Sequence, residues 1–209
     1  MTDDVPLWRL LIAIASVDDA EVLAILTAAP ALAQARVKEG ARRAAATDSY
    51  LSDIDHYVYA GDTALHVAAA AHRPEIVREL IRLGASVEAR NRRGAAPLHY
   101  AADGNPTSPR LNPVAQAATI VGLIASGADP NAVDKNDVTA LHRAVRTRCA
   151  QAVGTLLQGG ADALRRNGNG STPMMLATRQ TGRGGSGSPE AVAQQAEIIR
   201  LLEPYSVER

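Results

Sequence analysis

Three histidines at widely spaced but related positions are the first candidates for chemistry in this chain. His66, His99 and His142 are separated by 33 and 43 residues, and each directly follows a leucine. Neutral imidazole is a common zinc ligand, and three histidines can hold a catalytic zinc ion when their nitrogens converge. Whether these three converge depends on the elements that carry them.

Each of these histidines lies in a nine-residue pattern that occurs four times. The copies are residues 61–69, 94–102, 137–145 and 170–178, and their third positions are separated by 33, 43 and 33 residues. Three copies keep Leu-His, and all four keep an alanine two residues after the histidine position. A T-P-L-H-x-A core at a period near 33 resembles the ankyrin repeat. The resemblance implies an all-α fold, an ankyrin repeat solenoid of stacked helix-turn-helix units with β-hairpin-like fingers.

The resemblance covers about residues 59–209, which divide into four repeats. Together with residues 1–58, interpreted as an N-terminal helical cap and linker, they are expected to form one domain, residues 1–209. The apolar spacing and the helix-forming composition of the cap and linker predict helices over residues 7–16, 20–28 and 31–46.

Local signals place the ends of the helices within each repeat. Thr63 stands at an N-cap position, where its hydroxyl can accept a backbone N–H, whereas Ala96 lacks that hydroxyl in repeat two. Gly84 is expected to end a second helix in the left-handed conformation. His72 falls where the family has glycine between its helices, a place that can demand a positive φ.

Two repeats carry insertions between their helices, near residues 103–116 and 182–189. Three prolines exclude continuous helix from the first insertion, so its second helix is expected to resume with Ile120. Both insertions should project from the edge away from the fingers. They could flank a groove over repeat three, near Cys149 and Gln151, although tolerated loop growth is the default interpretation, because loop extension costs little.

A zinc site is not expected from the motif histidines. In stacked repeats they would lie in successive layers roughly 10 Å apart, whereas a zinc–nitrogen bond is about 2 Å long. The resemblance implies instead that each histidine ties its motif to the neighbouring finger. The glycine-rich segments 167–170 and 182–187 lack the Lys-Ser/Thr end of a phosphate loop, and no G-x-S-x-G sequence occurs. No catalytic residue, metal or cofactor is expected.

Arginines carry the clearest indication of a partner. Residues 90–183 contain 12 Lys and Arg against 5 Asp and Glu, a net charge of +7, whereas residues 1–89 contain 8 against 13, a net charge of −5. The resemblance implies that partners bind the concave face made by fingers and first helices. Carried over to this sequence, the predicted partner-binding residues are Arg90, Arg92, Arg93, Tyr100, Asp103, Arg143, Arg146, Arg165, Arg166 and Arg179.

One leading hypothesis and three alternatives follow for the function. Guanidinium groups on neighbouring repeats can bind carboxylates or phosphates, which favours a non-enzymatic module that binds the acidic surface of an unidentified protein. A solvated face balanced by the chain's own acids is the simpler interpretation. Binding of a polyanion or nucleic acid through the same face is disfavoured by the scarcity of aromatic residues and the zero net charge. An enzyme with a loop-side pocket is a remote alternative.

Composition also predicts where the protein works. A single cysteine excludes an internal disulfide and fits a reducing compartment. The apolar runs are too short to span a membrane. We therefore expect a cytoplasmic monomer that binds a protein partner without a cofactor, and we expect neither membrane contact nor nucleic-acid binding.

Overall fold

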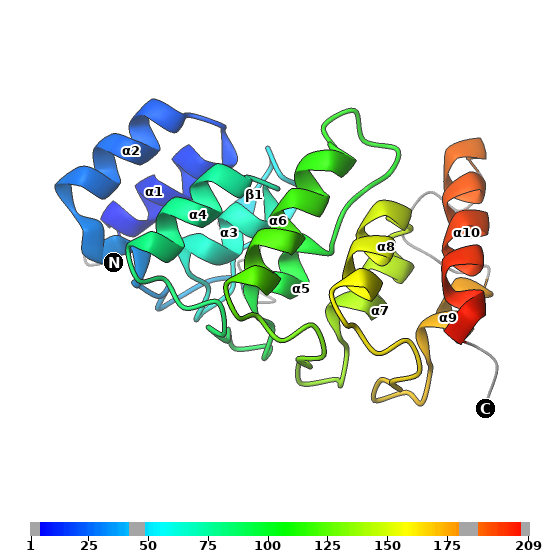
Figure 1. Ribbon diagram of the computed structural model, residues 1–209. Coiled ribbons are helices and arrows are strands. Elements are labelled where there is room, and N and C mark those ends of the chain that lie inside the picture. Colours follow the sequence, from blue (N-terminus) through cyan, green and yellow to red (C-terminus); the bar gives the residue numbers. More distant parts are fainter. Residues whose placement is uncertain (1–4, 42–48, 180–187, 206–209) are drawn as a thin grey trace.

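Antiparallel helix pairs stacked in a row make up the fold (Figure 1). The computed structural model describes residues 5–41, 49–179 and 188–205. The pairs are α1 (Val5–Ala15) with α2 (Asp19–Ala28), α3 (Ala64–Ala70) with α4 (Pro74–Arg82), α5 (Pro97–Ala101) with α6 (Pro113–Ala125), α7 (Ala140–Arg146) with α8 (Ala150–Gln158), and α9 (Pro173–Ala177) with α10 (Pro189–Leu202). From α3 onward, first helices contact first helices and second helices contact second helices, which gives the predicted two-layered solenoid. A 3₁₀ turn, η3 (Glu203–Tyr205), follows α10.

Small aliphatic side chains allow the first helices to lie close together. Ala68, Ala69 and Ala101 have no exposed surface, and Leu65 and Leu98 are buried beside them. The second helices add larger side chains to the same core, namely Ile76, Val77, Leu80, Ile120, Leu123, Val153, Leu156 and Ile198. A continuous core therefore forms without any phenylalanine, because short side chains fill the narrow space between layers.

The predicted caps and turns are present at most of their positions. The Thr139 hydroxyl accepts the backbone N–H of His142 at 3.3 Å, whereas Ala96 begins α5 without a side-chain acceptor. Gly84 ends the α4 turn with φ +89°, and His72 adopts φ +51° in the turn between α3 and α4. Both positive φ values confirm the sequence predictions.

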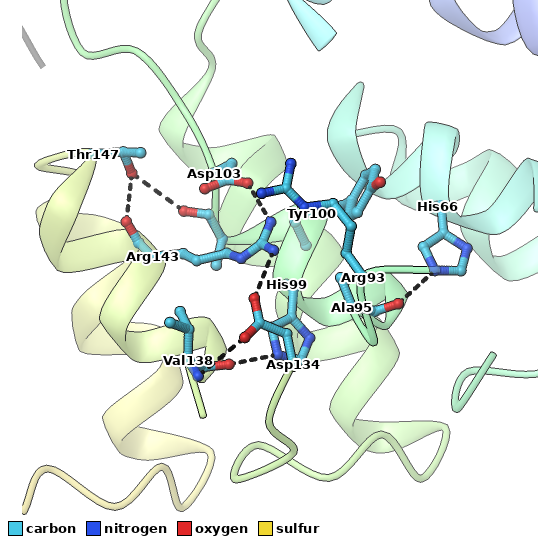
Figure 2. Close-up of polar contacts among 12 residues, drawn as sticks. His66, Arg93, Ala95, His99, Tyr100, Asp103, Asp134, Val138, Arg143 and Thr147 are labelled. Atoms are coloured by element: carbon cyan, nitrogen blue, oxygen red, sulfur yellow. Dashed lines mark hydrogen bonds and ion pairs between the residues drawn. The ribbon is translucent and has the colours of Figure 1, made fainter. Parts of the chain in front are cut away.

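The motif histidines link each repeat to the next. The Nε2 atom of each lies 3.0 to 3.1 Å from a backbone carbonyl oxygen in the following finger. The pairs are His66 with Ala95 and His99 with Val138, both drawn in Figure 2, and His142 with Ser171. In each ring Nδ1 accepts the backbone N–H of the helix-capping residue at 3.2 to 3.3 Å. Because Nδ1 accepts, Nε2 carries the proton and donates it to the carbonyl, so each ring is neutral. The predicted structural role is confirmed.

Backbone hydrogen bonds join the fingers in the same direction. The N–H of Arg92 donates to the carbonyl of Ala60 at 2.8 Å, and the N–H of Lys135 donates to that of Arg93 at 3.0 Å. Each finger also closes on itself, as in the 3.1 Å bond from the N–H of Asn91 to the carbonyl of Ala95. The fingers are therefore hairpin-like turns, as predicted.

The linker between cap and repeats departs from the prediction. The helix expected over residues 31–46 is wrong within the described residues: a 3₁₀ turn, η1 (Pro30–Ala33), is followed by non-helical chain to residue 41. The backbone of Val37 instead donates to the carbonyl of Asp62 and accepts from the N–H of Gly61. Pairing with a distant segment thus outweighs local helix propensity. Residues 42–46 lie outside the described residues.

A small hairpin completes the linker. Strands β1 (Tyr50–Leu51) and β2 (His56–Tyr57) pair in antiparallel register, with Tyr50 opposite Tyr57 and their ring centroids 4.8 Å apart. The tyrosine pair thus sits within the linker rather than on a repeat.

The repeat-two insertion extends a helix as well as a loop. α6 begins at Pro113, not with Ile120, because the Asn112 side chain accepts the backbone N–H groups of Val114 and Ala115 at 3.1 Å. Proline is well suited to this first helical position. The loop before it projects from the edge opposite the fingers (Figure 1). Residues 182–187 of the other insertion lie outside the described residues.

Exchanging one hydroxyl tests the caps. Thr139→Ala should lower the free energy of unfolding by about 1 kcal/mol, and Ala96→Thr should raise it by a similar amount, because each change removes or adds an N-cap acceptor. Urea denaturation of both variants beside the parent protein measures the difference. A loss of stability in Ala96→Thr would mean that the buried site at Ala96 has no room for the larger side chain.

The neutral histidines make stability depend on pH. Burial lowers the pKa of His99 from 6.5 to about 4, and burial also lowers the pKa of His66 and His142. Between about pH 4 and 6.5, protons therefore bind preferentially to the unfolded chain, in which the His99 imidazole has its ordinary pKa. The stabilisation is complete above pH 6.5 and is lost as the pH falls toward 4. His99 accounts for about 3 kcal/mol of that loss.

A single substitution tests this dependence. His99→Gln should lower the free energy of unfolding at pH 7.5 and reduce its slope between pH 6.5 and 4 by as much as one proton. Urea denaturation curves at several pH values give the slope for the parent and the variant. Equal slopes would show that His99 is not held neutral by the fold.

Candidate partner-binding surface

The three predicted arginines of the finger between repeats one and two contact the chain's own residues. Arg90 donates to the carbonyl of Val133 at 2.6 Å. The guanidinium of Arg92 lies 5.4 Å and that of Arg93 5.0 Å from the Tyr59 ring centroid, and Arg93 also donates to the Tyr59 hydroxyl at 3.0 Å. All three arginines are exposed, but each is already held in place by the linker or by a neighbouring finger.

The β1–β2 hairpin packs on repeat two. The His56 ring lies 4.3 Å from the Tyr100 ring, centroid to centroid. From the repeat-two insertion, Arg110 donates to the carbonyls of Ser52 and Asp53 at 2.9 and 3.1 Å. The linker thus occupies part of the face that the sequence predicts for a partner.

Tyr100 is a core residue and not a surface contact, which corrects the prediction for this position. It is 2% exposed, and its hydroxyl donates to Asp62 at 2.9 Å and accepts from Asn91 at 2.8 Å. Burial, followed by the nearby Asp62 carboxylate, raises its pKa well above the ordinary value. The phenol therefore stays protonated and serves as an internal hydrogen-bond donor.

Arg143 joins repeats two and three through two carboxylates (Figure 2). Its guanidinium lies 2.8 Å from Asp103 and 3.3 Å from Asp134, and its side chain is 11% exposed. The three groups form an internal ion-pair network, so the predicted contact residues Arg143 and Asp103 neutralise each other. A charge reversal at Arg143 would place a third carboxylate among these acids, so it would test stability rather than binding.

The remaining predicted arginines lie in repeats three and four and their fingers. Arg146, Arg165, Arg166 and Arg179 are all exposed. Burial is the main cause that lowers the pKa of His142, and the charges of Arg165 and Arg146 lower it further. Arg166 donates to the carbonyl of Gly170 at 2.7 Å. Within the described ranges, no Asp or Glu forms an ion pair with Arg165, Arg166 or Arg179.

A groove lies over repeat three, where the sequence predicts one. Its volume is about 520 Å³, and its floor is formed by Cys149 and by α8 as far as Gln158. The repeat-two insertion lines one side through Pro106 and Leu111. α10 lines the other side through Gln194, whose Oε1 also accepts the backbone N–H of Ala150 at 2.9 Å. Binding of a partner in this groove stays a prediction.

Cys149 is 3% exposed, and burial raises the pKa of its thiol, which therefore stays protonated. Across residues 5–41, 49–179 and 188–205, no three His, Cys, Asp or Glu side chains are placed to hold a metal. The same ranges include no helix with the length and apolar character needed to cross a membrane.

Two arginines important to the surface are absent from the predicted set. Arg110 donates to the backbone of the linker hairpin. It lies in the proline-containing insertion, where the sequence gives no pattern from which the direction of a side chain could be predicted. Arg148 is 5% exposed beside Arg146. It stands nine residues after a capping threonine, as His72 does, so the signal that identified His72 could also have identified Arg148.

The architecture defines a protein of stacked helical repeats. The family described as ankyrin repeats (3 copies) matches residues 10–108 and 114–203. The chain therefore belongs to the ankyrin repeat family. Ankyrin repeats generally mediate protein–protein interaction and are typically not enzymatic.

Curated relatives share the repeats but are much longer. The chain is 33% identical over 110 residues to the B-cell lymphoma 3 protein of Homo sapiens. The aligned region makes up 53% of this chain and 23% of that protein. It is 35% identical over 132 residues to ankyrin repeat and SOCS box protein 16 of Mus musculus, an alignment that covers 62% of this chain and 28% of that protein. It is 37% identical over 103 residues to the E3 ubiquitin-protein ligase KEG of Arabidopsis thaliana, an alignment that covers 48% of this chain and 6% of that protein. The chain thus spans less than a third of each relative.

Removing the central guanidinium tests the internal role of Arg143. Arg143→Met should lower the free energy of unfolding by about 3 kcal/mol, because it leaves Asp103 and Asp134 without their buried counter-charge. Arg165→Met, at an exposed position, should change stability by less than about 0.5 kcal/mol. Urea denaturation measures both variants. Similar stabilities for the two would contradict a structural role for Arg143.

Proposed function

We propose that this chain is a non-enzymatic protein-binding module whose exposed arginines bind the acidic surface of another protein. The binding residues are those of the third and fourth repeats, Arg146, Arg165, Arg166 and Arg179. The proposal treats residues 1–209 as one domain, with cap and linker at 1–58 and four repeats at 59–209, that acts as a monomer in the cytoplasm.

The observation that carries this proposal is an imbalance of charge along the array. At the joint between repeats two and three, Arg143 meets two carboxylates within ion-pair distance. In the described part of repeats three and four, Arg165, Arg166 and Arg179 meet none. Exposed guanidinium groups without internal counter-charges favour association with carboxylates and speed the encounter with an acidic partner.

Binding of nucleic acid has less support than binding of an acidic protein. Tyr100 is the one aromatic side chain among the predicted contact residues, and it is buried. Single-stranded nucleic acid is held largely by stacking on exposed aromatic rings. Duplex binding depends on many phosphate contacts, which a chain of zero net charge makes less readily.

Charge reversal on the finger tests the proposal. Tagged protein is used to capture partners from an extract of the native source, and the partners are identified by mass spectrometry. Arg165→Glu/Arg166→Glu should weaken partner binding about tenfold, which corresponds to about 1.4 kcal/mol. The matched control is Arg78→Glu/Arg82→Glu on the outer helix α4, which makes the same change of charge on exposed side chains.

The outcomes separate the hypotheses. Loss of the partner in the finger variant but not in the α4 control supports the proposal. Equal retention in both variants would remove the arginine face as the binding site. Retention on heparin that falls steeply with salt, without a captured protein, would favour the polyanion alternative.

A further inference from the structure

A small cavity at the joint between repeats three and four is lined by three arginines. It has a volume of about 110 Å³ and lies between α7, α9 and α10. Arg146, Arg148 and Arg179 contribute its charged groups, and Val145, Leu176 and Ile198 contribute apolar side chains. None of the described residues that line it is acidic. The cavity therefore combines a concentrated positive charge with partial exclusion of water.

Arg148 is the unusual member of this group. It exposes 5% of its surface, and within the described residues its side chain has no hydrogen-bond or ion-pair partner. No Arg148 nitrogen is among the described side-chain atoms that are both fully buried and unpaired, so the guanidinium keeps some contact with water in the cavity. A charge with so little hydration and no counter-charge is still unfavourable, because the surrounding protein replaces only part of its hydration. A ligand that supplies negative charge at this point would remove that cost.

At the joint between repeats one and two, the positions equivalent to Arg148 and Arg179 are occupied by residues that contact each other. His72 and Arg148 each stand nine residues after the first-helix cap, and both have positive φ, 51° and 60°. The Nε2 atom of His72 lies 3.0 Å from the carbonyl oxygen of Asp103 in the next repeat. In repeat four, the position equivalent to Asp103 is Arg179. A neutral contact in one joint is thus replaced by two positive charges in the other.

The chain that follows offers no internal counter-charge in its sequence. Residues 180–188 contain no Asp or Glu, and they include one more arginine, Arg183. The nearest following acid is Glu190. Glu197, further along α10, lines the separate groove over α8 and pairs with Arg200 at 2.9 Å.

We propose that this cavity binds a phosphate monoester carried by a phosphorylated side chain of the partner. The inference rests on the proposed function, because Arg146 and Arg179 belong to the same binding surface. A phosphate monoester carries nearly two negative charges at neutral pH and three terminal oxygens, which suits several guanidinium groups better than one carboxylate does. The volume is well below that of a pocket for a drug-sized ligand, so one compact anionic group is the appropriate occupant.

The first experiment uses the purified chain with inorganic phosphate as the probe. At constant ionic strength, phosphate should raise the thermal midpoint and shift the amide resonances of residues 145–148 and 176–179 in a saturable way, and acetate should do so at least tenfold more weakly. Arg148→Gln should abolish the phosphate effect. Arg165→Gln, on the same face but outside the cavity, should retain it.

Stability without phosphate gives a second readout. Because Arg148 is largely buried and has no counter-charge among the described residues, Arg148→Gln should be at least as stable as the parent protein in phosphate-free buffer. A variant that binds no phosphate but folds normally therefore separates loss of the site from loss of the fold. An effect of phosphate that persists in Arg148→Gln, or an equal effect of acetate, would overturn the proposal.

Capture from phosphatase-treated extract separates this inference from the proposed function. Partner binding should fall about tenfold after phosphatase treatment, and the remaining binding should be insensitive to Arg148→Gln. If phosphatase treatment changes nothing while Arg165→Glu/Arg166→Glu still removes the partner, the phosphate site is overturned and the acidic-surface proposal stands. If the finger variant retains the partner, the proposed function fails whatever the phosphate result.

Discussion

The hydrogen bond from each motif histidine to the next finger is the constraint on which the array depends. It requires a neutral ring, with Nδ1 occupied by the cap of its own helix and Nε2 directed to a carbonyl of the following repeat. One side chain thereby fixes both the start of a helix and the position of its neighbour. Ring burial enforces that neutrality, so packing and protonation are coupled in every repeat that carries the histidine.

Charge divides the same surface into two parts. At the joint of repeats two and three, Arg143 is satisfied internally by Asp103 and Asp134, and the linker hairpin lies against the neighbouring Tyr100. At the joint of repeats three and four, Arg148 and Arg179 have no such partners within the described residues. The family fold is common to both joints, and the difference arises from which side chains occupy equivalent positions.

The sequence predicts the fold well because its signals are local. Caps, glycines and motif histidines act within a few residues of where they stand, as the φ values of Gly84 and His72 illustrate. Non-local contacts were not predictable in this way. The linker is extended because Val37 pairs with Asp62, and Tyr100 is buried because His56 packs on it. The acids that neutralise Arg143 lie 9 and 40 residues away, so the concave face looked more basic in sequence than it is in the structure.

The contact between Arg110 and the hairpin also bears on how the protein unfolds. Repeat arrays are held mainly by nearest neighbours, so that separate portions can open one after another. Here Arg110, in the repeat-two insertion, donates hydrogen bonds to backbone carbonyls 57 and 58 residues earlier in the chain. The linker also forms backbone hydrogen bonds with the start of repeat one. These crossing contacts bind the amino-terminal half into one cooperative unit. We expect the carboxyl-terminal repeats, which these contacts do not reach, to open separately from that unit.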